Sequence, residues 1–227
     1  MQNMKHKLLK TKKLAVVFGT FAPMHIGHVD LITRAKREND AALVFVSGTN
    51  TEEDRGTRVG LHLKRRFRYV REVFHDDELV VVDKLDEEGI ISEQNGLENW
   101  FEILHELIKE NTDYQFEKIT FYIGEEKYQK PLLSYFENVF NDEYLLGKSD
   151  TESSDSIIKK EVGIKIIDKS IIPVSSAEIL KKPLAHWRYI TKPFRRHFTK
   201  KVLVVGSASG GKTTLIKDLG RIFNAPV

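Results

Sequence analysis

The sequence contains no cysteine among its 227 residues, which excludes disulfides, thiol catalysis and cysteine-based zinc sites. No run approaches the roughly 20 apolar residues that a membrane-spanning helix requires. An apolar run of five residues, 14–18, follows a lysine-rich start, but it ends at Gly19 without a small-residue cleavage site, which excludes a secretory signal. Hydrophobic residues make up 41% and charged residues 30%, a balance typical of chains that bury a core. We therefore predict a soluble, globular, cytoplasmic protein.

Charge is distributed unevenly along the chain, although the formal net charge is only +3. Residues 76–126 carry 16 acidic side chains against 3 basic ones. Residues 181–201 carry eight Lys or Arg and no acid, and residues 58–71 carry six more basic side chains. Two interpretations remain open for each basic cluster: a solvated helix face, or a surface that binds a polyanionic ligand or nucleic acid.

Short apolar runs rich in β-branched and aromatic residues alternate with helical patterns. The expected strands span residues 14–18, 42–46, 79–82, 119–123 and 164–167. The clearest helix spans residues 97–108, where apolar residues recur at the spacing of one helix face, and a second spans residues 132–140. Near-continuous apolar strands separated by helices favour an α/β fold, a doubly wound parallel sheet whose ligands lie at the carboxyl ends of the strands.

The first expected strand runs into a loop, residues 19–28, and residues 29–35 continue as a helix. His25 and His28 are three residues apart and therefore share one face of the first helical turn. A helix start offers unpaired N–H groups and the positive end of the helix dipole, and two imidazoles add donors aimed at the same anion. The loop therefore predicts a phosphate site.

Other residues of the loop favour the same interpretation. Gly19 and Gly27 remove side chains where a phosphate must approach the backbone, and Pro23 stiffens the loop. A metal site is the alternative, but the histidine spacing is not H-x-x-x-H and no cysteine exists. Phosphate binding is thus preferred to metal binding and to a packing role for either histidine.

These residues carry a resemblance to a known superfamily. The pattern G-x-F-x-P-x-H-x-G-H is formed by Gly19, Phe21, Pro23, His25, Gly27 and His28. It is similar to the signature of the nucleotidyltransferase superfamily, which includes nicotinamide mononucleotide (NMN) adenylyltransferases, pantetheine phosphate adenylyltransferases and cytidylyltransferases. The resemblance implies a Rossmann-like fold in which His25 and His28 bind a nucleotide triphosphate and stabilise charge as a phosphate nucleophile attacks the α-phosphorus. It also implies that Thr20 contacts the nucleotide with the other loop residues, and that Mg²⁺ accompanies ATP without a metal site in the protein.

A second segment, residues 174–180, resembles the S-x-T-x-x-R element of the superfamily. That element places a helix start against the nucleotide phosphates, and it implies that Ser175 and Ser176 contact the nucleotide. Ser175 and Glu178 also form an S-x-x-E capping box, so the purely structural interpretation is that Ser175 starts a helix. Both interpretations can hold together.

This second segment departs from the superfamily pattern at two positions. Ala177 stands where Thr is usual, and Leu180 stands where Arg is usual. The departures remove one hydroxyl and one fixed guanidinium from the phosphate side of the site. Lys181 or Lys182 is the sequence candidate for replacing the charge, although an ammonium does not reproduce a planar fork.

Two more segments resemble ligand contacts of the superfamily. Gly124, Glu125 and Tyr128 follow an expected strand and resemble the element near the adenosine; the alternative is an acidic loop that opens a helix. Trp100 is the candidate stacking partner for a nicotinamide ring and Asn99 the polar candidate for its amide. Because Trp100 lies on an apolar stripe, core packing is an equally good interpretation of this residue.

Near the C-terminus, residues 202–213 fit the P-loop pattern G-x-x-x-x-G-K-T between an expected strand, 202–205, and a helix, 214–223. Gly206 and Gly211 shape the loop, Lys212 reaches the β and γ phosphates, and Thr213 holds Mg²⁺ in this motif. Only 14 residues follow Thr213, so we expect a truncated, non-functional start of a kinase domain.

The order of these motifs resembles the NadR-type bifunctional family, which joins NMN adenylyltransferase to ribosylnicotinamide kinase. The resemblance implies adenylyl transfer from ATP to NMN, giving NAD and pyrophosphate. It also implies ribosylnicotinamide kinase activity in an intact member, which we do not expect here because so few residues follow the P-loop. The alternatives are a nucleotidyltransferase for pantetheine phosphate or glycerol phosphate, and a non-catalytic module that senses NAD or ATP. We expect no DNA partner, because no helix-turn-helix domain is found, and no membrane partner; the sequence is compatible with a homo-oligomer.

The motifs divide the chain into four segments. We expect a basic extension at residues 1–13, a nucleotidyltransferase domain at 14–182, a basic connector at 183–201 and the P-loop segment at 202–227. A polar stretch within residues 141–160, centred on 147–156, predicts a mobile surface loop.

Overall fold

A computed structural model of the protein describes residues 8–90, 96–149, 158–168 and 171–223. Residues 1–7 of the expected basic extension and residues 150–156 of the expected polar loop lie outside the described residues. The chain divides into two compact units, Met1–His197 and Phe198–Val227. Each unit is described by itself below.

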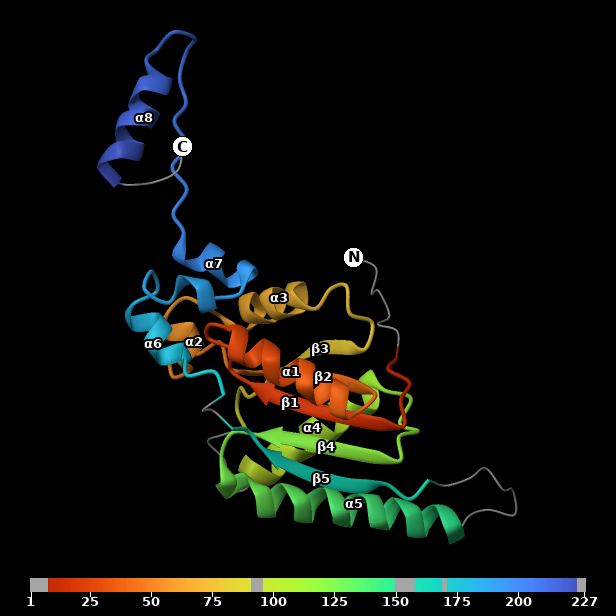
Figure 1. Ribbon diagram of the computed structural model, residues 1–227. Coiled ribbons are helices and arrows are strands. Elements are labelled where there is room, and N and C mark those ends of the chain that lie inside the picture. Colours follow the sequence, from red (N-terminus) through yellow and green to blue (C-terminus); the bar gives the residue numbers. More distant parts are fainter. Residues whose placement is uncertain (1–7, 91–95, 150–157, 169–170, 224–227) are drawn as a thin grey trace. The chain divides into compact units, whose positions relative to one another are not determined.

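The larger unit contains a five-stranded parallel sheet with the strand order β3-β2-β1-β4-β5 (Figure 1). The strands are β1 Lys13–Gly19, β2 Ala41–Gly48, β3 Val80–Asp86, β4 Lys118–Ile123 and β5 Glu161–Ile166. Each strand overlaps a run expected from the sequence. The doubly wound α/β fold, with the strand order of a Rossmann-like sheet, is therefore confirmed.

Helices cover both faces of the sheet, which explains why its central strands are apolar throughout; β2 is buried along its whole length. α1 Ile26–Glu38 contacts β1 and β2, and α3 Leu63–Val73 contacts β2 and β3. α4 Gly96–Asn111 and α5 Gln129–Ser149 contribute Leu104, Ile108 and Phe136 to one core cluster with Val16 and Phe45 of the strands. The expected helices at residues 97–108 and 132–140 are confirmed.

The remaining elements before the P-loop segment are short and were mostly missed by periodicity. They are α2 Arg55–Arg58, η1 Glu126–Tyr128, α6 Ser176–Lys181, η2 Trp187–Tyr189 and α7 Lys192–Phe198. The last helix, α8 Lys212–Phe223, overlaps the one expected at residues 214–223. One expectation is corrected at the end of α5, because the helix continues through residues 141–149 rather than giving way to a loop there. No proline interrupts this part of the chain, and the one glycine in it is tolerated within a helix.

Residues 183–197, which the sequence assigns to a connector, pack within the larger unit. Ile190 and Phe194 are 1% and 0% exposed, and Thr191 Oγ1 donates a hydrogen bond to the Met24 carbonyl at 3.2 Å. The sequence predicts a connector here because basic residues outnumber the few apolar residues that become buried. The compact unit therefore ends at His197, and residues 183–197 support the loop that follows β1.

The strand order reverses between β1 and β4, since β2 and β3 lie on one side of β1 and β5 lies beyond β4 (Figure 1). The loops that leave these two neighbouring strands diverge at their carboxyl ends, and such switch points are where doubly wound sheets bind ligands. In the described part of the chain, no helix is long and apolar enough to span a membrane.

Candidate functional site

The loop after β1 ends at His25, which is the N-cap residue of α1. Nδ1 of His25 accepts a hydrogen bond from the Gly27 N–H at 3.2 Å, and Nδ1 of His28 accepts one from the His25 N–H at 3.3 Å. A neutral imidazole that accepts at Nδ1 carries its proton on Nε2. The capping box therefore sets the tautomer of both histidines, so that Nε2–H of each ring is the donor for a ligand.

The two imidazoles stack on each other, with ring centroids 3.8 Å apart and planes inclined by 31°. Burial lowers the pKa of His25 from 6.5 to about 4. Burial also lowers the pKa of His28 well below its usual value, and a charge on His25 lowers it further. Both rings are consequently neutral near pH 7, and they bind an anion as hydrogen-bond donors rather than as cations.

Gly27 makes room for the histidine itself. A Cβ at Gly27 would lie 3.1 Å from Cε1 and Nδ1 of His25, closer than an ordinary contact, whereas a Cβ at Gly19 would meet the Phe21 ring at an ordinary 3.5 Å. Phe21 adopts a positive φ of 47° and lies edge-on to His28 at 5.1 Å between ring centroids. The loop therefore packs around the two imidazoles.

The second predicted segment begins α6 and contacts the first loop. Ser175 and Glu178 form the expected capping box: Ser175 Oγ accepts from the Glu178 N–H at 3.2 Å, and Glu178 Oε2 accepts from the Ser175 N–H at 2.9 Å. Ser176 Oγ donates to the Pro23 carbonyl at 3.0 Å. Ser175 thus starts a helix, as its structural interpretation predicts, and Ser176 ties that helix to the histidine loop.

A cavity of about 590 Å³, here called the histidine cavity, brings these segments together. The predicted site residues on its wall are Gly19, Phe21, His25, Gly27, His28, Gly124, Ser175 and Ser176. Neither Lys181 nor Lys182 is among the described residues that line it; its cationic wall residues are Arg34 and Arg55. Arg34 Nε is 2.9 Å from Asp30 Oδ2.

A second cavity of about 570 Å³, here called the aromatic cavity, is lined largely by aromatic and apolar side chains. Predicted residues on its wall are Thr20, Trp100, Glu125 and Tyr128. Glu125 and Tyr128 thus line the aromatic cavity, whereas the preceding Gly124 lines the histidine cavity. Asn99 is not among the described residues lining either cavity. Phe18, at the end of β1, belongs to both walls.

Trp100 makes a polar contact that the sequence did not predict. Its Nε1–H donates to Glu87 Oε1 at 2.9 Å, and its ring packs edge-on against Phe18 at 5.0 Å between centroids. Burial raises the pKa of the Glu87 carboxyl, while the bond from Trp100 lowers it. The aromatic cavity therefore combines π faces with a half-buried carboxylate.

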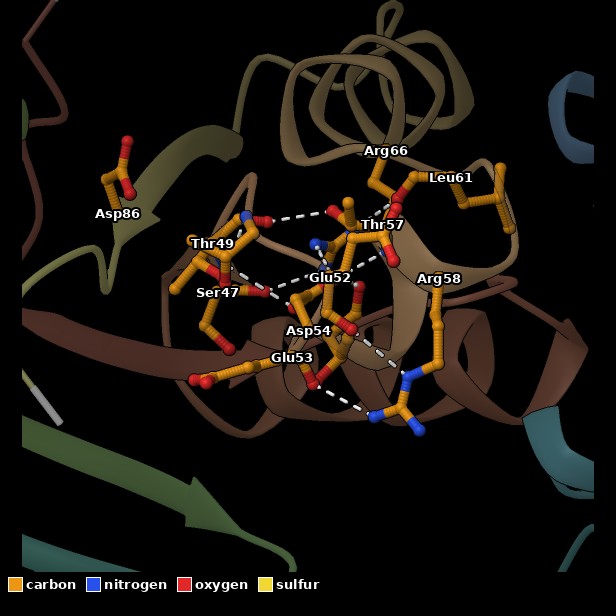
Figure 2. A network of polar contacts seen from close by, with 12 residues as sticks. Ser47, Thr49, Glu52, Glu53, Asp54, Thr57, Arg58, Leu61, Arg66 and Asp86 are labelled. Carbon is orange, nitrogen blue, oxygen red and sulfur yellow. Dashed lines mark hydrogen bonds and ion pairs between the residues drawn. The ribbon is translucent and has the colours of Figure 1, made fainter. Parts of the chain in front are cut away.

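The sequence also missed the part played by Arg66 of α3, which it placed in a basic cluster (Figure 2). The side chain is completely buried, and its guanidinium donates to the Thr20 carbonyl at 2.7 Å and the Ser47 carbonyl at 2.8 Å. It also donates to the Leu61 carbonyl at 2.7 Å and to Asp54 Oδ1 at 2.8 Å. Both interpretations of this cluster are therefore wrong for Arg66, which joins the ends of β1 and β2.

Two glycines leave the space that this guanidinium occupies. A Cβ at Gly48, where φ is +140°, would lie 2.7 Å from Arg66 Nη2, and a Cβ at Gly56 would lie 2.7 Å from Arg66 Nε. Asp54 is the N-cap of α2 and accepts from the Thr57 N–H at 2.7 Å. In the sequence, the sign of this network is the pair Gly48 and Gly56 on either side of Asp54.

The smaller unit holds the P-loop segment. Residues 202–205 form no strand, contrary to expectation, since a strand requires a partner for its ladder and none of the described strands pairs with them. The loop itself has positive φ at Ser209 and Gly211, and Lys212 Nζ donates to the Ser207 carbonyl at the start of α8. Phosphate binding by Gly206, Lys212 and Thr213 stays a prediction.

The described side chains include no group of three or more His, Asp or Glu residues that could hold a metal ion.

The chain is similar to known proteins in sequence and in fold. A family model described as cytidylyltransferase-like matches residues 16–209. The trifunctional NAD biosynthesis/regulator protein NadR of Salmonella typhimurium is 24% identical over 225 residues, covering 95% of this chain and 48% of that protein. This chain therefore spans about half the length of the curated relative.

Two solved structures are similar as well. A crystal structure of NadR in complex with NR has a TM-score of 0.75 at 38% identity, covering 96% of this chain and 54% of that one. A crystal structure of NadR in complex with NAD and AMP-PNP has a TM-score of 0.74 at 38% identity, covering 97% and 56%.

Proposed function

The chain belongs to the cytidylyltransferase-like family of nucleotidyltransferases, and on this premise we propose that it transfers the adenylyl group of ATP to NMN, forming NAD and pyrophosphate. One observation carries the proposal: the neutral histidine pair lines a cavity that shares Phe18 with an aromatic cavity containing Trp100. Two neighbouring cavities suit two substrates, a nucleotide and an acceptor. The similar NadR structures, in complex with NR and with NAD and AMP-PNP, support this choice.

In the proposed reaction, a phosphate oxygen of NMN attacks the α-phosphorus of ATP. The bond between that phosphorus and the oxygen leading to the β-phosphate breaks, and pyrophosphate leaves with the bonding electrons. Nε2–H of His25 and of His28 donates to phosphate oxygens and stabilises the charge that develops on them. No covalent enzyme intermediate is needed, because positioning and hydrogen bonding supply the catalysis.

Mg²⁺ enters this reaction as part of the MgATP substrate. Magnesium keeps several waters and commonly binds substrate phosphates with one or two carboxylates. The histidine cavity has Asp30, Asp168 and Glu178 on its wall, but Asp30 is paired with Arg34, Glu178 accepts from Ser175, and Asp168 also has a partner. These residues suit an ion carried by the phosphates better than one held by the protein.

The aromatic cavity supports NMN as the acceptor. A nicotinamide ring attached to ribose is a flat aromatic cation, which stacks on indole and is attracted to a nearby carboxylate. Trp100 supplies the indole and Glu87 the carboxylate, with Trp100 Nε1 2.9 Å from Glu87 Oε1. Pantetheine phosphate and glycerol phosphate have no aromatic cation and would use neither group.

A direct assay tests the proposal. The protein is incubated with ATP, Mg²⁺ and one acceptor at a time (NMN, pantetheine phosphate or glycerol phosphate), and pyrophosphate and NAD are measured. We expect pyrophosphate and NAD in equal amounts with NMN only. Binding of ATP and NMN without NAD formation would instead support the nucleotide-sensing alternative, and release with another acceptor would identify a different transferase.

A further inference from the structure

The histidine cavity has fewer cationic groups than a triphosphate site calls for. Leu180 stands where the superfamily resemblance places an arginine, and neither Lys181 nor Lys182 lines the cavity. Desolvation lowers the pKa of both His25 and His28, so both rings are neutral near pH 7. A triphosphate with several negative charges therefore needs a cation from elsewhere in the fold.

Only two cationic side chains line this cavity among the described residues, and they differ in their pairing. Arg34 Nε is held 2.9 Å from Asp30 Oδ2, so this arginine already has an anionic partner on the cavity wall. Arg55, the first residue of α2, is exposed and forms no ion pair with a carboxylate in the described part of the chain. An arginine that lines a cavity without an ion-pair partner has all its N–H donors available to an anionic ligand.

The backbone that carries Arg55 is anchored on both sides. Asp54 caps α2 by accepting from the Thr57 N–H, and the same carboxylate accepts from Arg66 at 2.8 Å (Figure 2). Arg66 in turn donates to the Thr20 carbonyl in the loop that leads to the histidines. The network therefore fixes the start of α2 relative to the histidine loop and limits the ordering that Arg55 must undergo on binding.

We propose that Arg55 binds the triphosphate of the nucleotide and supplies the guanidinium that Leu180 does not. Its planar fork can donate two parallel hydrogen bonds to phosphate oxygens, which a lysine cannot. The proposal rests on the proposed nucleotidyltransferase function. It adds to that site a residue that is distant in sequence from both recognised motifs but lines the same cavity. Arg55 acts beside the histidines, which contact the same phosphate chain as neutral donors.

Calorimetric titration of wild type, Arg55→Ala and Arg55→Lys with MgATP and, separately, with adenosine tests this assignment. Loss of a charge-assisted contact predicts a Kd for MgATP about 10- to 100-fold higher in Arg55→Ala, with an intermediate value in Arg55→Lys. The Kd for adenosine stays unchanged, because it has no phosphate. Arg71→Ala is the control: Arg71 is exposed on α3 and does not line the cavity, so this variant removes the same charge and binds MgATP as wild type does.

Turnover measurements separate the outcomes. We expect the KM for ATP to rise in Arg55→Ala while the KM for NMN changes less than about twofold, since the contact is to one substrate. An unchanged Kd for MgATP, an equal loss of adenosine affinity, or a rise confined to the KM for NMN overturns the assignment even if the wild type makes NAD. If the Kd for MgATP rises in Arg55→Ala but the wild type makes no NAD, the triphosphate contact of Arg55 is supported and the proposed function is contradicted.

Discussion

The Arg66 guanidinium donates to the Asp54 carboxylate over 2.8 Å, with the two side chains only 0% and 7% exposed. This buried ion pair lies where the loops after β1 and β2 meet, because Arg66 also donates to the Thr20 and Ser47 carbonyls. The charge is thus compensated by one carboxylate and three carbonyls, counting Leu61. One side chain of α3 therefore holds together the loops that carry Thr20, Arg55 and the histidines.

Replacing Arg66 with methionine should destabilise the protein strongly. Removal of one partner leaves the Asp54 carboxylate buried without its cation, and such losses cost about 3–5 kcal/mol of unfolding free energy. Urea unfolding at pH 7 measures this change. Lys64→Ala on the same helix, which removes an exposed charge, should change the free energy by less than about 0.5 kcal/mol. A loss below about 1 kcal/mol in Arg66→Met would contradict the importance assigned to the network.

His28→Ala should lower kcat by about 100- to 1,000-fold, because it removes a preorganised donor to the phosphate charge. Steady-state assays with ATP and NMN measure the effect, and circular dichroism with urea unfolding checks that the fold is retained. His62→Ala is a matched control, since His62 is exposed and its side chain makes no capping bond to α3. Loss of cooperative unfolding in His28→Ala would instead assign this residue a structural role.

Stability should fall in acid through His25. Its pKa is about 4 in the folded protein and 6.5 as the ordinary value, so the unfolded chain binds a proton that the folded protein does not. The stabilising contribution is complete above about pH 6.5 and decreases as the pH falls towards 4, by about 3 kcal/mol in all. Unfolding free energies between pH 7 and pH 4.5 measure the slope, which should be shallower in His25→Gln. An equal slope in both proteins would disprove the contribution.

The fold could be predicted because each strand contains a short apolar run and the long helices have regular apolar stripes. α3 escaped detection for a physical reason. Its buried positions include Leu63, Arg66, Tyr69 and Val70, which follow helical spacing, but the arginine occupies a place where an apolar residue is expected. From sequence alone the segment therefore looks like a basic cluster, because the polar partners of Arg66 come from other segments of the chain.

The same distinction applies to the site. His25, His28 and the Ser175 capping box are local patterns, so the sequence contains all their information. The pairing of Glu87 with Trp100, and the position of Arg55 on the cavity wall, depend on how β2, β3 and α4 pack, and no spacing encodes these contacts. The local helix starts at His25 and Ser175 were thus accessible from sequence, whereas charge compensation across elements required the fold.

Glu87 should determine which pyridine nucleotide the protein accepts. Nicotinate mononucleotide carries a carboxylate in place of the carboxamide of NMN, and a second negative charge beside Glu87 is repelled. We expect wild type to prefer NMN, and Glu87→Gln to lower kcat/KM for NMN about 10-fold while that for nicotinate mononucleotide is kept or raised. Rates with each acceptor at saturating ATP give the ratio.

The glutamine variant is informative because its amide oxygen can still accept from Trp100 Nε1–H, so the indole keeps its place while the charge is lost. Glu88→Gln is the matched control, since Glu88 is an exposed neighbour that does not line the aromatic cavity. A purely structural role for Glu87 predicts equal losses with both acceptors, and so an unchanged ratio. If the ratio of kcat/KM for NMN to that for nicotinate mononucleotide falls in Glu87→Gln and not in Glu88→Gln, the charge at Glu87 is the cause.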